Sequence, residues 1–192
     1  MQDQGTPGLA RQDDDEAVLV DRAAAGDAPA FAALYDRHLQ QVYRHVYYRV
    51  GHRNDAEDLS QQVFLQAWRA MPRYKRAGAP FVAWLLTIAH NEVIAFYRKS
   101  RQTNYLEVEP ETRDLWSDPE AQALSQFDRL AVRRAILRLK PEQQQVVMMR
   151  FIEHFEYSAI AGALGKNEGN IRVIQHRALN ELRRLLAHTV QS

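Results

Sequence analysis

Between Arg172 and Arg184 the sequence places cations, hydrogen-bonding groups and one aliphatic side chain at helical spacing. Arginine can donate two parallel hydrogen bonds to guanine or pair with phosphate, histidine and asparagine can bond to base edges, and valine can contact a thymine methyl group. On a helical wheel these residues share one face, which comprises Arg172, Val173, His176, Arg177, Asn180, Arg183 and Arg184. The pattern indicates a helix that enters a DNA groove, although a solvated basic helix in a bundle would look the same.

The segment that must position this helix runs from Tyr157 to Leu186 and reads as two helices around a glycine turn. The second helix has an inward apolar stripe formed by Ile171, Ile174, Ala178, Leu182 and Leu185. The apolar face of the first helix comes from Ile160, Ala161 and Leu164. Gly165 can adopt the left-handed C-cap conformation, and Asn167 or Glu168 can begin the next helix. Together these features predict a helix-turn-helix.

A second candidate surface lies on the predicted helix from Asp55 to Met71. Its predicted cap is Asn54 or Asp55, with Glu57 or Asp58 completing a capping box. Its inward stripe consists of Ala56, Leu59, Val63, Phe64, Ala67 and Met71. The opposite side carries Leu65 among polar groups, with Trp68 at the boundary, which is typical of a protein interface. The alternative is that Leu65 and Trp68 pack on a neighbouring helix.

The composition is that of a globular chain. It has 192 residues, of which 46% are hydrophobic, enough for one ordinary domain or two small ones. No apolar run is long enough to span a bilayer, and the first sixteen residues lack the order of a signal peptide. The absence of cysteine excludes disulfides, thiolate chemistry and zinc fingers. We therefore expect a cytoplasmic protein without membrane insertion.

The net charge of +1 conceals a segregation of charge along the chain. Residues 69–101 carry seven cations and one acid, and residues 126–192 carry eleven cations and six acids. Between them, residues 104–122 carry six acids and one cation. Two basic segments of this kind are typical of contacts with a polyanion such as nucleic acid.

Helical periodicity with few breakers predicts an all-α protein of two small helical domains joined by an acidic flexible linker. Residues 1–12 are expected to be a disordered tail. The first domain spans residues 13–102, with helices over 17–25, 28–50, 55–71 and 80–100. Two prolines and scattered acids predict the linker over residues 103–120. The second domain spans residues 121–192, with helices over 121–139 and 142–153 before the helix-turn-helix, and Pro141 suits a first helical turn.

The seven histidines and the many carboxylates make an enzyme a hypothesis to consider. His38, His45 and His52 recur every seven residues and could line one helical side, but Gly51 interrupts the helix before His52. No HExxH motif, glycine-rich phosphate loop or nucleophile motif accompanies them. His90 and His154 are interpreted as structural or solvated. We therefore predict no enzymatic activity, no catalytic residues, no metal, no cofactor and no small-molecule substrate.

Three motifs in order give the sequence a family resemblance. They are DAEDLSQQVFLQAWR from Asp55, FVAWLLTIAHN from Phe81, and YSAIAGALG from Tyr157 with the helix that follows. Over roughly residues 17–186, their order and spacing resemble the extracytoplasmic-function (ECF) sigma factors of bacterial RNA polymerase. The resemblance implies a sigma factor that binds core RNA polymerase and directs promoter-specific initiation of transcription. Core polymerase and promoter DNA are the implied partners, and an anti-sigma factor is a further one.

The first domain resembles sigma region two, in which the helix with an acidic start binds the polymerase. The resemblance assigns this contact to Asp55, Glu57, Asp58, Gln61, Gln62, Leu65 and Trp68. The following loop and helix resemble the part that opens the minus-ten promoter element and holds an unstacked base. The resemblance assigns these contacts to Tyr74, Lys75, Arg76, Trp84, Asn91, Arg98, Lys99 and Arg101. Their side chains offer stacking, amide and phosphate-binding groups. Phe81 is interpreted as a core residue, and core packing is also the alternative for Trp84.

The second domain resembles sigma region four, whose recognition helix enters the major groove of the minus-thirty-five element. The resemblance assigns this contact to Lys166, Asn170, Arg172, Val173, His176 and Arg177. The linker would run through the polymerase interior, where its acids mimic nucleic acid or serve only solubility. The sequence departs from the family pattern by losing acids at Gln62, at Ala95 and at Ser158 with Ala159. These departures bear on how the chain contacts polymerase and on which promoter sequence it reads, and not on the class of protein.

A stand-alone helix-turn-helix regulator that binds duplex DNA as a dimer is the competing interpretation. It explains the C-terminal domain equally well. It does not explain the helix from Asp55 with Leu65 and Trp68 on its polar side, nor the separate basic segment around Arg98.

Overall fold

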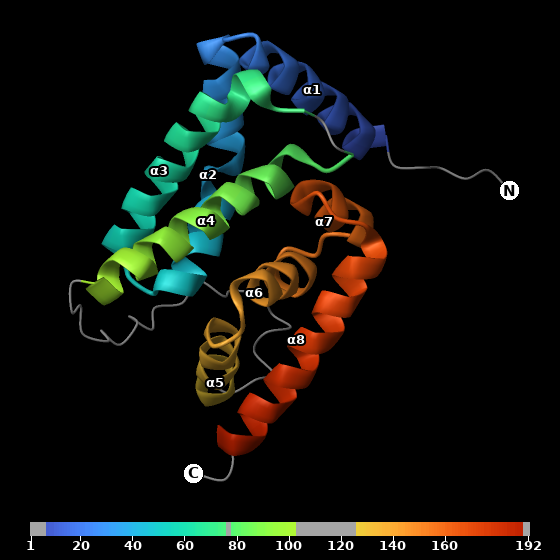
Figure 1. Cartoon of the computed structure of the whole chain (residues 1–192). Helices are drawn as coiled ribbons and strands as arrows, with labels where there is room; N and C mark the ends of the chain where they lie inside the picture. The colour runs from blue at the N-terminus through green and yellow to red at the C-terminus, as the bar shows by residue number, and fades with distance from the viewer. Residues whose placement is uncertain (1–6, 76–77, 103–125, 190–192) are drawn as a thin grey trace, which may run out of the picture.

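The computed structural model describes residues 7–75, 78–102 and 126–189, and every element within these ranges is helical (Figure 1). The helices are α1 (Pro7–Ala24), α2 (Ala28–Val50), α3 (Arg53–Ala70), α4 (Phe81–Gln102), α5 (Gln126–Leu137), α6 (Pro141–Val147), α7 (Tyr157–Leu164) and α8 (Glu168–Thr189). A 3₁₀ turn, η1 (Met71–Arg73), follows α3, and a π-helical turn, η3 (Met148–Ile152), follows α6. The all-α prediction is confirmed, whereas the predicted linker over 103–120 lies outside the described residues.

The first module packs α1, α2, α3 and α4 around one apolar core. The predicted helix over 28–50 is confirmed at both ends. The side chain of Asp27 accepts a hydrogen bond from the Ala30 amide at 3.1 Å, and Gly51 ends the helix in the left-handed conformation at φ 78°. The apolar stripe predicted for α3 faces inward, and Phe81 is buried in the same core, as predicted.

Two helix starts differ from the prediction. Helix α1 begins at Pro7, inside the predicted tail, because proline suits the first turn, where no amide hydrogen bond is needed. Helix α3 begins at Arg53 with His52 as its N-cap, and no side chain caps it. The predicted cap at Asn54 or Asp55 is therefore wrong, since both residues lie within the first turn and Glu57 pairs with Arg53 at 2.8 Å instead.

The second module contains the predicted helix-turn-helix. Pro141 occupies the first turn of α6, Gly165 ends α7 at φ 62°, and the Asn167 side chain accepts the Asn170 amide at 2.8 Å. One prediction needs correction, because the helix expected over 142–153 is not uniform. Its end widens into the π-helical turn η3, in which the Glu153 amide donates to the Met148 carbonyl at 3.0 Å. This turn changes the direction in which Glu153 leaves the helix.

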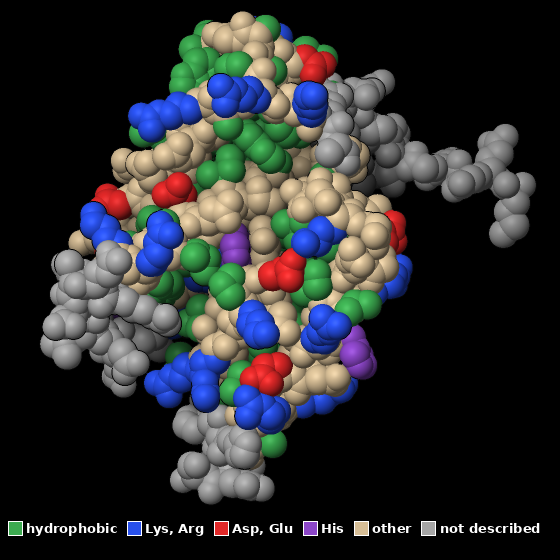
Figure 2. Space-filling model, viewed as in Figure 1, with side chains coloured by type: hydrophobic (Ala, Val, Ile, Leu, Met, Phe, Trp, Pro, Cys, Tyr) green, Lys and Arg blue, Asp and Glu red, His purple; other side chains and the backbone are tan. Residues whose placement is uncertain are grey.

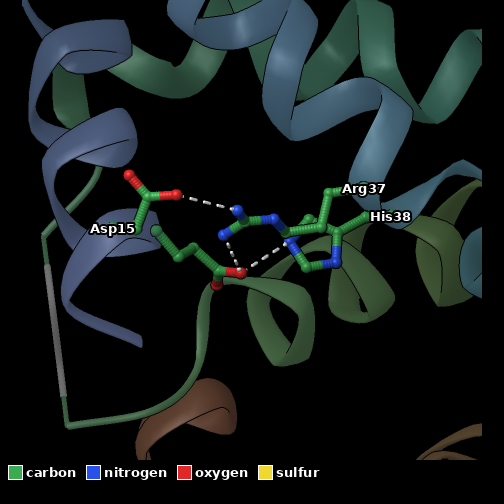
Figure 3. Close-up of polar contacts among 4 residues, drawn as sticks. Asp15, Arg37 and His38 are labelled. Carbon is green, nitrogen blue, oxygen red and sulfur yellow. Dashed lines mark hydrogen bonds and ion pairs between the residues drawn. The ribbon is translucent and has the colours of Figure 1, made fainter. Parts of the chain in front are cut away.

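An ion-pair network attaches α1 to α2 (Figure 3). Arg37 contacts Asp15 at 3.2 Å and Glu16 at 3.4 Å, and the His38 ring contacts Glu16 at 3.1 Å. The His38 ring also packs against Phe81, with ring centroids 5.7 Å apart. Helix α1 is thereby connected through α2 to the start of α4.

The two modules pack directly against one another (Figure 1). Helix α7 lies against α4, and α5 lies against the C-terminal part of α2. Ala83 of α4 is fully buried in an apolar cluster whose other buried members, Val146, Met149, Ile160, Ala161 and Ile171, belong to the second module. A shared interface therefore joins the two folded modules, and the domain boundary predicted at residue 120 lies outside the described residues.

Candidate nucleic-acid interface

Helix α8 presents the predicted polar face to solvent. Arg172, Val173, His176, Arg177, Asn180, Arg183 and Arg184 are all exposed, and the predicted inward stripe from Ile171 to Leu185 packs in the second module. Val173 has an exposed fraction of 48%, which is high for an aliphatic side chain. On the face seen in Figure 2, Lys and Arg side chains lie over both modules, and several gather over the lower part. The exposed face and the buried stripe predicted for this helix are confirmed.

The start of α8 also suits an anion. Asn167 caps the helix, and Asn170 and Lys166 are exposed beside it. The amides of a helix N-terminus favour phosphate because they carry partial positive charge. Lys166 forms an ion pair with Glu142 of α6 at 2.9 Å, which holds the lysine near the turn. A phosphate could replace the Glu142 carboxylate as the partner of this lysine.

Tyr157, the first residue of α7, fixes the position of the Arg172 side chain. The Arg172 guanidinium lies 3.9 Å from the centroid of the Tyr157 ring, and the Arg150 guanidinium lies 4.8 Å from the same centroid. Arg172 also contacts Glu168 one turn earlier at 3.5 Å. Cation–π contacts of this kind contribute about 0.5–2 kcal/mol. The sequence motif that begins at Tyr157 did not predict this contact, because the contact joins two helices across the turn.

Aromatic residues form a cluster at the other predicted DNA surface. Tyr74 lies 4.7 Å from Trp84 and 5.6 Å from Phe81 between ring centroids, and Trp84 lies 5.4 Å from Phe81. Phe81 is buried, while Tyr74 and Trp84 are half-buried, so the cluster has one core member and two members at its edge. Trp84 therefore packs against the core and is partly buried, while its contact with DNA stays a prediction.

The remaining predicted minus-ten residues extend along α4 from this cluster. Trp84, Asn91 and Arg98 follow one another at intervals of seven residues and so share one helical face. Asn91, Arg98, Lys99 and, before the helix, Lys75 are exposed. Arg76 and the side chain of Arg101 lie outside the described residues. The geometry thus gives a strip with an aromatic cluster at one end and basic groups at the other.

The predicted polymerase-binding face of α3 is exposed as a group. Glu57, Asp58, Gln61 and Leu65 are exposed, and Asp55, Gln62 and Trp68 are half-buried. The two apolar residues of this face, Leu65 and Trp68, differ in whether they are exposed or packed on a neighbouring helix. Trp68 packs on Phe31 of α2, with ring centroids 5.0 Å apart, whereas Leu65 keeps an exposed fraction of 44%. Leu65 is therefore the apolar centre of this face.

The histidines that raised an enzymatic reading are structural. His38 and His45 are buried and hydrogen-bonded to glutamates, His90 is buried beside Arg49, and His52 is the N-cap residue of α3. His154 is exposed and adopts a left-handed backbone conformation at φ 58°. Among the described residues, no group of three or more histidine or acidic side chains could hold a metal ion, and no helix is long and apolar enough to cross a bilayer.

Sequence reasoning missed the polar contacts between the modules. Glu153 of the second module accepts hydrogen bonds from His45 at 3.0 Å and from Gln41 at 2.9 Å, and its side chain has no exposed surface. For Glu153, burial alone would raise the pKa, but the hydrogen bonds from His45 and Gln41 and the nearby Arg44 outweigh burial and lower it. Burial also lowers the pKa of His45, more than its bond to Glu153 raises it. The pair is therefore a neutral imidazole that donates to a carboxylate.

Arg49, near the end of α2, forms a second connection between the modules. It donates to the His90 ring at 2.9 Å within the first module and to the Gln144 side chain of α6 at 3.1 Å. Burial lowers the pKa of Arg49 to about 10 and, with the Arg49 charge beside it, lowers the pKa of His90 to about 3. Arg133 of α5 donates to the Tyr48 and Arg49 carbonyls, which the end of α2 leaves without helical partners. A pattern of single-helix periodicity could not have revealed these contacts.

Comparison with known proteins identifies the family. The family model for sigma-70 region 2 matches residues 34–103, and the model for sigma-70 region 4 matches residues 129–182. The ECF RNA polymerase sigma factor SigD of Mycobacterium tuberculosis is 30% identical over 185 residues, covering 93% of this chain and 87% of SigD. The chain belongs to the ECF family of RNA polymerase sigma factors. The two family models place the ECF region-two segment in the first module and the region-four segment in the second.

BldN is a further ECF relative, and two solved structures share the fold. The sigma factor BldN of Streptomyces coelicolor is 41% identical over 172 residues, covering 88% of this chain, and this chain spans 64% of the length of BldN. The structure of CnrH in complex with the cytosolic domain of CnrY has the same fold, with a TM-score of 0.63 and 22% identity over 90% of this chain and 97% of CnrH. The structure of RpoE from Bartonella quintana in complex with the anti-sigma factor NepR has a TM-score of 0.57, with 24% identity over 82% of this chain and 96% of RpoE.

Proposed function

We propose that this ECF sigma factor binds core RNA polymerase through α3 and reads a promoter with two separate surfaces. The polymerase contact consists of Asp55, Glu57, Asp58, Gln61, Gln62, Leu65 and Trp68. The strip along α4 with Tyr74 and Lys75 opens the minus-ten element, and the exposed face of α8 reads the minus-thirty-five element. The observation that carries the proposal is the coexistence, in one ECF chain, of an exposed reading helix and an exposed face on α3 centred on Leu65.

The chemistry of each surface supports its role. Arg172, His176 and Arg177 on α8 provide bidentate and single hydrogen bonds for base edges and phosphates, and Val173 provides an apolar contact. On α4, the half-buried Trp84 ring is the candidate for stacking on an unstacked base, and base stacking on an aromatic ring contributes about 1–3 kcal/mol per base. Capture of one or two bases by this cluster offsets local melting of the duplex.

A stand-alone dimeric regulator would leave two surfaces without a purpose. It has no use for the exposed face of α3 or for the basic strip along α4, and the family models match both modules as parts of sigma factors. We further infer that an anti-sigma factor controls this chain, since RpoE, which shares its fold, is found in a complex with the anti-sigma factor NepR. We place this action with the polymerase, in the cytoplasm, and assign the chain no reaction chemistry of its own.

Reconstitution of transcription tests the proposal. Purified protein is added to core polymerase that lacks a sigma subunit, together with a library of promoter fragments, and run-off transcripts are sequenced. We expect transcripts from promoters that share two sequence elements. A chain that binds duplex DNA tightly alone but never starts transcripts with core polymerase would contradict the proposal.

Two variants separate the surfaces. Arg172→Ala should weaken reading of the upstream element and leave binding to core polymerase unchanged, because Arg172 is exposed on α8. Asp58→Arg should weaken binding to core polymerase and leave the base preference unchanged, because Asp58 is exposed on α3. If both variants changed only DNA affinity, the assignment of α3 to polymerase binding would be wrong.

A further inference from the structure

We infer that helix α1 is a positioning element for reading of the minus-ten element, and that Glu16 and His38 are its positioning residues. This inference rests on the proposed function. The group that they position is the minus-ten cluster, defined as Tyr74, Phe81 and Trp84. Tyr74 and Trp84 contact DNA under the proposed function, whereas Glu16 and His38 act through Phe81 without touching DNA.

Helix α1 lies outside the part of the chain that matches sigma-70 region 2. The family model matches residues 34–103, whereas α1 spans Pro7–Ala24, so the match gives this helix no role. Val20 and Ala23 of α1 are nevertheless buried in the same apolar core as Met71 and Phe81. A helix outside the family match is thus packed into the core that carries the minus-ten cluster.

The minus-ten cluster has two supports, and α1 reaches both. The first support is η1, which packs against α1 and leads directly into Tyr74, whose amide donates to the Met71 carbonyl at 3.0 Å. The second support is the start of α4, where Phe81 packs on the His38 ring with centroids 5.7 Å apart. Displacement of α1 would therefore disturb the cluster from two sides.

Glu16 connects α1 to the second support (Figure 3). Its carboxylate contacts the His38 ring at 3.1 Å and Arg37 at 3.4 Å, and His38 is buried. The hydrogen bond from one ring nitrogen limits rotation of the imidazole, and the imidazole packs against Phe81. Because side chains in a core interdigitate with few voids, movement of the His38 ring displaces Phe81.

Phe81 in turn supports the two residues that face DNA. Its ring centroid lies 5.6 Å from that of Tyr74 and 5.4 Å from that of Trp84, and the Tyr74 and Trp84 centroids lie 4.7 Å apart. A site that captures one base needs contact side chains held by packing and by hydrogen bonds behind them. The position of the Trp84 ring therefore depends on a chain of contacts that begins at Glu16.

Base unstacking at the minus-ten element tests the inference. The holoenzyme of the full chain and core polymerase is mixed with a promoter identified by the reconstitution above, in which 2-aminopurine replaces one minus-ten base and fluoresces when that base leaves the stack. His38→Ala should lower unstacking about fivefold to tenfold, because the stacking partner is misplaced. Binding to core polymerase and to a duplex with only the upstream element should stay as in the wild type.

Two further variants separate positioning from loss of stability. Glu16→Ala removes the carboxylate and leaves the His38 ring, so it remains informative if His38→Ala fails to fold, and it should lower unstacking in the same selective way. The matched control is Asp15→Ala, which removes the acid that contacts Arg37 at 3.2 Å and should leave unstacking unchanged. Equal effects of Glu16→Ala and Asp15→Ala, or equal losses in all three measurements, would overturn the inference.

A double substitution identifies the residue through which His38 acts. In the Trp84→Ala background, His38→Ala should cause no further loss of unstacking, because the ring that it positions is gone. Losses that multiply would show that His38 acts by another route and would also overturn the inference.

The position of Trp84 is also measured without polymerase or DNA. The chain has three tryptophans, so 5-fluorotryptophan gives three fluorine resonances, which are assigned by replacing each tryptophan with phenylalanine. His38→Ala and Glu16→Ala should shift or broaden the Trp84 resonance. The resonance of Trp68, which packs on Phe31, should stay unchanged. A Trp84 resonance that neither variant moves would contradict positioning by α1.

These results also distinguish the inference from the proposed function. A chain that starts transcripts, but whose His38→Ala and Glu16→Ala variants unstack the minus-ten base normally, keeps the proposed function and loses the inference. A chain that never starts transcripts contradicts the proposed function, while the fluorine spectra still decide whether Glu16 and His38 set the Trp84 ring.

Discussion

His45 and Glu153 lie 108 residues apart in sequence and 3.0 Å apart in space, where the imidazole Nδ1 of one module donates to a buried carboxylate of the other. The second ring nitrogen of His45 is also buried and has no hydrogen-bond partner among the described residues. A buried imidazole with one donor bond and no second partner resists protonation, because the cation would need another acceptor. The contact between the modules is therefore sensitive to pH.

The first prediction is that stability falls as the pH drops below about 6.5. Because the pKa values of His45 and His90 are lowered in the folded chain, the unfolded chain binds more protons below pH 6.5, which favours unfolding. The lowered pKa of Glu153 adds to the loss in the same direction below pH 4.5. We expect a melting temperature roughly 5–10 °C lower at pH 5 than at pH 7.5, measured by circular dichroism.

The matched variant for this prediction is His45→Asn, whose amide nitrogen can stand in for Nδ1 but does not titrate. It should show a smaller loss of melting temperature between pH 7.5 and pH 5 than the wild type. A wild-type melting temperature that is constant or rises over this range would contradict the assignment of neutral imidazoles.

A second prediction concerns Tyr157 as the residue that positions Arg172. Tyr157→Leu removes the ring that lies 3.9 Å from the Arg172 guanidinium, and we expect about a threefold to tenfold loss of affinity for the upstream element. Tyr157→Phe keeps the ring and should behave like the wild type. In the Arg172→Ala background, Tyr157→Leu should have no further effect, as measured by DNA binding of the holoenzyme. Independent, additive losses would show that Tyr157 acts only through packing.

A third prediction separates an interface residue from an ordinary exposed apolar residue. Leu65→Ser on α3 should weaken association with core polymerase at least tenfold and change the free energy of unfolding by less than about 0.5 kcal/mol, because Leu65 is exposed. Val18→Ser on α1 alters another exposed aliphatic residue and should leave association unchanged. Equal effects of the two variants in a pull-down titration would argue against the α3 face.

The fourth prediction tests backbone conformation at two turns. Gly165→Ala should destabilise the chain by about 1 kcal/mol, because the left-handed conformation is costly for alanine even though nothing within 4 Å would clash with its Cβ. His154→Gly should stabilise the chain, since glycine adopts the left-handed conformation freely. Urea unfolding measures both changes. Two effects of the same sign would contradict the explanation by backbone strain.

The fifth prediction concerns the attachment of α1. Glu16→Gln should cost about 1 kcal/mol of stability, because it weakens charge-assisted bonds to Arg37 and His38. The hydrogen bond from His38 lowers the pKa of Glu16, so this contribution is present above about pH 4.5 and is lost as the pH falls further. Asp15→Asn, at a mostly exposed position in the same network, should cost less than about 0.5 kcal/mol. Equal losses in chemical unfolding would contradict the ranking.

Local features of the sequence predicted much of the fold and of α8. The helix predicted over 28–50 ends at Gly51, Gly165 and Asn167 form the turn, and the period of 3.6 residues separates Ile171 from Arg172. These features depend on neighbours within one or two helical turns, so the sequence contains the information they need. The same reasoning failed at the start of α3 and at η3, where the ends of helices depend on what packs around them.

The tertiary structure alone decided which polar groups meet between the modules. By itself the sequence determined the helical fold, the exposed basic face of α8 and the family to which the chain belongs. It could not determine that Glu153 meets His45, that Arg49 lies between His90 and Gln144, or that Tyr157 stacks on Arg172. Helical periodicity shows which side of a helix is buried and not what covers it, because the partner comes from another helix and is chosen by tertiary packing.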